Sequence, residues 1–123
     1  MSPQQQARAF RTAFRVKNST TPASRAKQKK LIVEEFKEFL EAEQQLIIGF
    51  SKNATDTLKE LADLVYVCYQ YAENLGWNLD EALYRVHQSN MTKLDDEGKP
   101  IFREDGKVLK GPNYTEPNLN DLV

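Results

Sequence analysis

The sequence predicts an all-α domain of about four helices, followed by an extended C-terminal arm. Three observations favour this fold class. Apolar residues recur at helical spacing through residues 26–48 and 57–75. A glycine and an asparagine after the second stretch mark a helix end and a helix start. Most glycines and prolines lie in residues 95–123, which we assign to the arm, whereas residues 1–94 form the helical part of the same domain.

The N-terminal half is expected to contain one short and one long helix. Residues 3–15 form an amphipathic pattern in which Phe10 and Phe14 lie four apart on one face. A polar loop with a proline follows. The long second helix is expected to begin near Ala23 or Ser24.

Two more helices are expected after a break in the chain. Residues 49–56 contain a glycine, an asparagine and an aspartate, and are predicted to break the pattern. The third helix is then expected over residues 57–75 and ends at Gly76, a favourable C-cap residue. Asn78 opens the fourth helix, which is expected to run to about Leu94.

The arm is expected to be extended because glycines and prolines interrupt any helical pattern after Asp95. Residues 101–103 and 107–109 carry apolar side chains on either side of Asp105 and Gly106. A turn at this pair would join two short strands, so a small hairpin is predicted.

Two pairs of carboxylates are the candidate functional residues. Glu35 and Glu38 lie three apart in one predicted helix, and Glu60 and Asp63 lie three apart in the next. Residues three apart share a helix face. At about 100° per residue, each pair falls within or beside the apolar arc of its helix. If the two helices pack face to face, four carboxylates converge.

A divalent metal site is the interpretation that we favour, because converging carboxylates repel one another and are costly to bury without cations. Two structural alternatives compete with it. Thr57 lies three residues before Glu60 and fits a capping box, and Lys27 or Lys30 could pair with the first two carboxylates. A capping box leaves three carboxylates unexplained, and two matching pairs in consecutive helices favour a metal.

Composition argues against several other classes of protein, namely nucleic-acid-binding, membrane and secreted proteins. The formal net charge of −1 gives no general attraction to nucleic acid or to an acidic membrane. No run approaches the roughly 18 apolar residues of a membrane helix, and the first residues lack the apolar run of a signal peptide. The single cysteine, Cys68, cannot form an internal disulfide. We therefore expect a cytoplasmic protein with no nucleic-acid or membrane partner.

The motifs, taken in order, give the chain a specific resemblance. Glu-Glu-x-x-Glu at residues 34–38 is followed by Glu-x-x-Asp at residues 60–63. Val-His-Gln-Ser-Asn-Met-Thr-Lys follows at residues 86–93, and Gly-Lys-Val-Leu-Lys-Gly-Pro-Asn-Tyr at residues 106–114. This order resembles the MazG-like all-α nucleoside triphosphate pyrophosphohydrolase superfamily, and the tail is similar to its small bacteriophage members. The resemblance implies a helical bundle that assembles through dimers, as a homodimer or homotetramer.

The resemblance also implies an activity. Members hydrolyse a (deoxy)nucleoside triphosphate between the α and β phosphates to the monophosphate and pyrophosphate, which shapes the nucleotide pool. Two or three Mg²⁺ ions per site, with Mn²⁺ as a substitute, would be held by Glu35, Glu38, Glu60 and Asp63, since hard cations take oxygen ligands. Such ions can activate water and neutralise developing charge. The catalytic assignment falls on Glu35 and Glu38, with Glu34 as an outer base.

Substrate contacts are implied for residues outside the carboxylate pairs. Asn90 and Lys93 are expected to contact sugar and phosphate, and Phe10 lies where relatives place base-contacting residues. The viral-type tail favours a purine deoxynucleotide, dGTP or dATP. The arm is expected to close over the triphosphate with three side chains, those of Lys107, Lys110 and Tyr114.

Two alternatives stay open. A related pyrophosphatase acting on dUTP, dCTP or phosphoribosyl-ATP would use the same carboxylates, and a substrate panel separates these activities. A non-enzymatic helical interaction module would keep the acidic pairs as salt bridges. That module predicts no stabilisation by metal ions.

Overall fold

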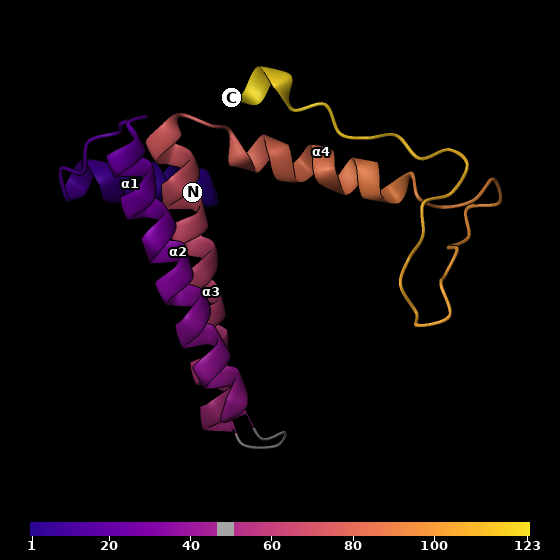
Figure 1. Cartoon of the computed structure of the whole chain (residues 1–123), viewed down its shortest axis with the longest axis horizontal. Coiled ribbons are helices and arrows are strands. Elements are labelled where there is room, and N and C mark those ends of the chain that lie inside the picture. Colours follow the sequence, from indigo (N-terminus) through magenta and orange to yellow (C-terminus); the bar gives the residue numbers. More distant parts are fainter. Residues whose placement is uncertain (47–50) are drawn as a thin grey trace. The chain divides into compact units, whose positions relative to one another are not determined.

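The prediction of an all-α fold is confirmed by a computed structural model that describes residues 1–46 and 51–123 (Figure 1). Within these residues the regular elements are helical and no strand is formed beyond a single β-bridge. None of the described helices is both long and apolar enough to cross a bilayer. The elements are α1 (Pro3–Ala13), α2 (Pro22–Gln44), α3 (Ser51–Leu75), α4 (Leu79–Met91) and the short 3-10 helix η1 (Asn120–Leu122).

The chain forms two compact units, Met1–Trp77 and Asn78–Val123. The first contains α1, α2 and α3, and the second contains α4, the arm and η1. The fourth helix therefore groups with residues 95–123, whereas the sequence pattern grouped it with the preceding helices.

The starts of α1 and α2 are fixed by local capping. The Ser2 hydroxyl accepts a hydrogen bond from the Gln5 backbone N–H, and the Gln5 side chain accepts one from the Ser2 backbone, which completes a capping box. The Thr21 hydroxyl accepts from the Ser24 backbone N–H at 3.2 Å, and Pro22 occupies the first helical turn. The second helix thus begins one residue before the predicted start.

The predicted break over residues 49–56 is wrong for its C-terminal part, because α3 already begins at Ser51. Gly49 lies outside the described residues. The Asn53 side chain donates from within α3 to the Gln45 carbonyl at 2.7 Å, so it satisfies the end of α2 instead of breaking the chain. The Thr57 hydroxyl donates to the Asn53 carbonyl at 2.8 Å inside the same helix. The proposed capping box of Thr57 with Glu60 is therefore excluded.

The predicted junction between the third and fourth helices is confirmed. Gly76 has a φ of +74°, and the Trp77 N–H donates to the Ala72 carbonyl at 2.9 Å, which forms a Schellman C-cap. The Asn78 side chain accepts from the Glu81 N–H at 3.1 Å and caps α4. The fourth helix ends at Met91, three residues before the predicted end.

A buried polar network joins the helices of the first unit. In Figure 1, α2 and α3 lie side by side along most of their length, and α1 packs against α3. At one end of this pair the Asn74 side chain, 2% exposed, donates to the Ser19 carbonyl and accepts from the Arg11 guanidinium at 2.8 Å. Arg11 is 4% exposed and also donates to the Gln70 side chain at 3.1 Å. These bonds fix α1 and the following loop against α3.

Replacing Asn74 by alanine is expected to destabilise the first unit by about 2–4 kcal/mol, because the buried Arg11 guanidinium and the Ser19 backbone both lose a partner. Urea unfolding measures the change. Gln44→Ala, at an exposed position of α2, serves as the control and is expected to change stability by less than about 0.5 kcal/mol. Equal midpoints for the two variants would contradict this role of the network.

The wide apolar arcs of α2 and α3 remain uncovered within the first unit. Large apolar side chains on both helices are exposed, and so is Phe14 of α1. Exposed apolar surface of this kind is typical of interaction sites, which agrees with the expected homodimer or homotetramer. The oligomeric state itself remains a prediction. The exposed large apolar residues of α2 and α3 are Leu31, Val33, Phe36, Leu40, Leu58, Leu61, Val65 and Tyr66.

The arm of the second unit is held against α4 by polar contacts. The Ser89 hydroxyl donates to the Thr115 carbonyl at 2.7 Å, and Arg85 forms an ion pair with Asp121. Gly111 lies so close to the turn after α4 that an added Cβ would come within 2.6 Å of the Lys93 carbonyl oxygen. Side chains cannot be accommodated there without a shift, so glycine permits the contact.

The predicted hairpin is confirmed in a reduced form. Phe102 and Val108 form a single antiparallel bridge, and the Leu109 N–H donates to the Ile101 carbonyl at 2.7 Å. Gly106, with a φ of +88°, allows the turn between them. The pairing is too short to form a named strand.

Candidate metal centre

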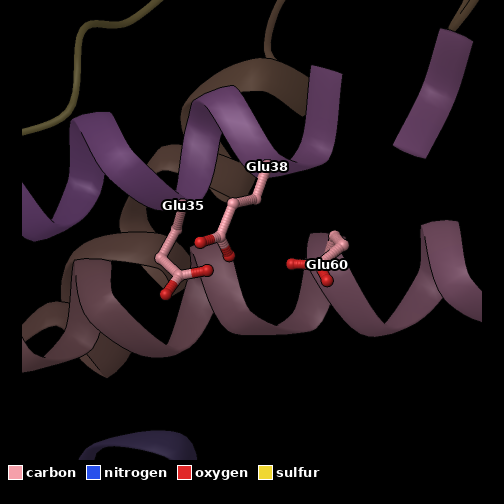
Figure 2. A group of neighbouring side chains, drawn as sticks. All are labelled: Glu35, Glu38 and Glu60. Carbon is pink, nitrogen blue, oxygen red and sulfur yellow. The ribbon is translucent and has the colours of Figure 1, made fainter. Parts of the chain in front are cut away.

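Three of the four predicted carboxylates converge between α2 and α3. Glu35 and Glu38 project from α2 and Glu60 projects from α3 into the space between the helices (Figure 2). One carboxylate oxygen from each residue lies within 4.8 Å of the other two. The spacing of three residues in α2 produces this arrangement, because it places both side chains on the face that meets α3.

The buried oxygens of this cluster have no hydrogen-bond partner. Glu35 and Glu60 are half-buried and Glu38 is exposed. The Oε2 atoms of Glu35 and Glu60 are buried, and neither contacts a donor among the residues that the structure describes. Buried polar groups are nearly always paired, and an unpaired buried carboxylate costs several kcal/mol, roughly. A cation bound here would satisfy both oxygens.

The cluster changes the acidity of one member. Burial of the Glu35 carboxyl, and then the closeness of Glu38 and of the negative charges of Asp63 and Glu60, raises its pKa to about 6. Glu35 therefore resists ionisation in the absence of a cation. The same electrostatic repulsion would favour binding of a divalent ion.

Asp63, the fourth predicted ligand, lies beside the cluster and contacts a lysine. Lys59 Nζ is 2.8 Å from Asp63 Oδ2 and 3.5 Å from Glu60 Oε1. Lys59 was not among the predicted site residues. Its position four residues before Asp63 on one helix was the available signal, but the predicted ion pairs involved Lys27 and Lys30 instead.

The donor set fits a hard divalent cation. All four candidate ligands offer carboxylate oxygens, which Mg²⁺ and Mn²⁺ prefer, and two of these oxygens lack any partner in the described chain. No sulfur or imidazole ligand belongs to the three-residue group. The residues present therefore match the metal that the sequence predicted, and the ion itself remains a proposal.

A polar cavity of about 360 Å³ adjoins the cluster. Two cluster carboxylates, Glu38 and Glu60, form part of its wall, and Lys59 is the basic residue that lines it. A ligand in this cavity would contact the cluster directly. The other lining residues are Glu41, Ala42, Gln45, Asn53 and Asp56.

Glu34, the candidate outer base, lies on the exposed face of α2. Its carboxylate faces Lys30 Nζ at 3.9 Å, and both side chains are at least half exposed. It does not belong to the converging group. Lys30 thus pairs with Glu34, which differs from the alternative in which it neutralises Glu35 or Glu38.

A second cavity, of about 530 Å³, lies beside the first turns of α2. Gln28 lines it, is 8% exposed, and has a buried side-chain oxygen without a hydrogen-bond partner among the described residues. Lys17 and Lys27 add positive charge to the same wall. This cavity could not be predicted from local patterns, because its wall combines the loop after α1 with the first turns of α2.

Phe10 packs within an aromatic group. Its ring centroid is 4.5 Å from that of Phe14 and 5.7 Å from that of Tyr66, and the residue is 38% exposed. These contacts join α1 to α3. The predicted contact of Phe10 with the base of the substrate remains a prediction.

The other candidate substrate residues all belong to the second unit. Asn90 is exposed in the last turn of α4, and Lys93 lies in the turn that follows. Lys110 Nζ lies 4.6 Å from the centre of the Tyr114 ring, so the structure brings these two residues together. Lys107 is exposed beside the bridge of the arm.

Comparison with known sequences identifies the family. A sequence model described as phosphoribosyl-ATP pyrophosphohydrolase matches residues 7–90, which is more than half of the chain and includes both carboxylate pairs. The chain belongs to the phosphoribosyl-ATP pyrophosphohydrolase family. The family is all-α and related to the MazG-like nucleotide pyrophosphohydrolases, so the predicted resemblance is confirmed at this level. The finer assignments, to the MazG-like proteins themselves and to their bacteriophage-type members, remain predictions.

A viral protein is also similar to the chain. An uncharacterized protein of Acanthamoeba polyphaga mimivirus is 27% identical over 104 residues, a match that covers 58% of this chain and 41% of the viral protein. The chain thus spans about two fifths of the length of that relative. Membership of the phosphoribosyl-ATP pyrophosphohydrolase family rests on the family match and not on this relative.

Proposed function

We propose that the chain is a metal-dependent pyrophosphohydrolase that cleaves a nucleoside triphosphate between its α and β phosphates. The observation that carries this proposal is the group of converging carboxylates with two buried, unpartnered oxygens. The group lies inside the region that matches the phosphoribosyl-ATP pyrophosphohydrolase family. The family description names hydrolysis of a pyrophosphate linkage in a nucleotide. The products would be a nucleoside monophosphate and pyrophosphate.

Glu35, Glu38, Glu60 and Asp63 would hold Mg²⁺ or Mn²⁺, in two or three ions per site. When bound, such ions neutralise phosphate charge and lower the pKa of bound water. The chain supplies the position of the substrate: Glu38 and Glu60 line the polar cavity, so the triphosphate would lie there. Water held between these carboxylates and the α phosphate would be oriented by hydrogen bonds to their oxygens.

The nucleoside end of the substrate would lie along α2 toward the second cavity. Gln28 precedes Glu38, the member of the polar cavity nearest to it along α2, by ten residues, so about 15 Å of helix separates the two positions. Glu35 lies between them, seven residues after Gln28 and on nearly the same face. A nucleobase entering this cavity can donate to the unpartnered Gln28 oxygen, as amides pair with the amino groups of bases elsewhere. A purine deoxynucleotide, dGTP or dATP, is the preferred substrate in this proposal.

Phosphoribosyl-ATP is a second candidate substrate, because two observations favour it. The family description names it. Lys17 and Lys27 line the second cavity, where they would attract the additional phosphate of the phosphoribosyl group. A plain base offers no negative charge to these lysines. Activity against dUTP or dCTP would require the same carboxylates with a different fit of the base.

The proposal predicts metal-dependent release of pyrophosphate from at least one member of a substrate panel. The protein is incubated with ribo- and deoxynucleoside triphosphates and with phosphoribosyl-ATP, in Mg²⁺, in Mn²⁺ and in EDTA. Pyrophosphate and monophosphate are expected in equal amounts with metal and neither in EDTA. Release of orthophosphate alone would show that another bond is cut, and turnover in EDTA would contradict the role of the cluster.

A further inference from the structure

Lys59 contacts two carboxylates that a metal ion would also bind. Its ammonium group contacts Asp63 at 2.8 Å and Glu60 at 3.5 Å, and both residues are candidate metal ligands. Asp63 is absent from the group of three converging carboxylates. One oxygen of Asp63 is instead held beside the ammonium group of Lys59.

The lysine and a divalent ion cannot both remain in contact with these carboxylates at low cost. Two positive groups within about 4 Å repel each other in water, and they repel more strongly near a protein surface, where the effective dielectric constant is lower. The Lys59 side chain is 66% exposed and flexible, so it can move away without loss of packing. Displacement of Lys59 is the cheaper response to metal binding.

We propose that Lys59 is a counter-cation of the carboxylate cluster, which positions Asp63 in the metal-free protein and is exchanged for a divalent ion when the site is loaded. This inference rests on the proposed metal-dependent function. Lys59 thereby sets the affinity of the site for metal, and the exchange restores the charge balance of the cluster in both states. The released ammonium remains in the wall of the polar cavity, where the triphosphate would lie.

Two substitutions test the exchange. Lys59→Met keeps the length of the side chain and removes its charge, and Lys59→Arg keeps the charge. Lys37→Met, at an exposed position of α2, is the matched control. The dissociation constant for Mn²⁺ is measured by titration calorimetry of the whole chain, and the melting temperature is measured in EDTA.

Lys59→Met is expected to bind Mn²⁺ roughly fivefold more tightly than the wild type, because the ion no longer competes with an ion pair. Its melting temperature in EDTA is expected to fall, since the cluster loses its only contacting cation among the described residues. Lys59→Arg and Lys37→Met are expected to retain the wild-type affinity within about twofold.

Unchanged or weaker Mn²⁺ binding by Lys59→Met, with normal binding by the wild type, would overturn the exchange and leave the proposed function intact. No Mn²⁺ binding by the wild type would overturn both. A tighter Mn²⁺ affinity shared by Lys37→Met would also refute the exchange, because it would show a general effect of net charge.

Discussion

Replacement of Glu38 by glutamine is expected to reduce pyrophosphate release at least about a hundredfold. Glu38 is the exposed member of the converging group and lines the polar cavity, so it would contact both the ion and the substrate. An amide keeps the shape of the side chain but removes the charge that a hard cation requires, and loss of groups near a metal typically costs tenfold to a hundredfold even outside the ligand set. Steady-state kinetics at saturating Mg²⁺ measures the loss.

Glu43→Gln provides the control for this experiment. Glu43 also lies in α2 and is exposed, but it belongs neither to the converging group nor to the cavity wall. The control is expected to retain wild-type turnover and Mn²⁺ affinity. Equal activity of Glu38→Gln and Glu43→Gln would show that the cluster does not carry the chemistry.

The second large effect concerns stability against pH in the absence of metal. The pKa of Glu35 is raised to about 6 in the folded chain, from an ordinary value of 4.5. The stabilising contribution of its protonated form is complete below about pH 4.5 and is lost as the pH rises through about 6. In EDTA the free energy of unfolding is therefore expected to fall by up to about 2 kcal/mol between pH 4.5 and pH 7.

Glu35→Gln is expected to remove this part of the pH dependence, because an amide does not titrate. Urea unfolding in EDTA at several pH values, with Glu43→Gln as the control, measures the difference between variants. A wild-type profile that runs parallel to that of Glu35→Gln would contradict the elevated pKa.

Metal ions are expected to raise the free energy of unfolding at neutral pH, where ionisation of Glu35 lowers it. At pH 7, Mg²⁺ at a hundred times its dissociation constant is expected to stabilise the wild type by about 2.7 kcal/mol, and Glu35→Gln by less. This result separates a metal-binding protein from the helical interaction module, which predicts equal unfolding curves with and without metal.

The fold could be predicted from the sequence where helix ends depend on adjacent residues. Gly76 and Asn78 form their caps with neighbours fewer than six residues away, and both were predicted correctly. Asn53 was interpreted as part of a break because asparagine disfavours helices. Its side chain instead reaches across to the Gln45 carbonyl, a contact that no local pattern contains.

In the candidate site, too, the features that depend on local spacing could be predicted, and those that depend on distant contacts could not. Convergence of Glu35, Glu38 and Glu60 follows from the spacing within α2 and from the packing of consecutive helices. The contact of Asp63 with Lys59 could not be predicted with similar force, because a long, exposed side chain can reach several acidic neighbours. The burial of Gln28 depends on the loop after α1, which carries no periodic signal.

The buried network around Asn74 has a consequence for the order of folding. The bonds from Asn74 to Ser19 and Arg11 join residues 55 and 63 positions apart, whereas α2 and α3 are consecutive in the chain. Contacts between distant positions require closure of a longer loop and form later, on average, than contacts between successive helices. We therefore expect α1 to dock late in folding. Interactions that form after the transition state govern how fast a native chain unfolds. The Arg11–Asn74 contact would therefore lengthen the lifetime of the folded first unit by slowing its unfolding.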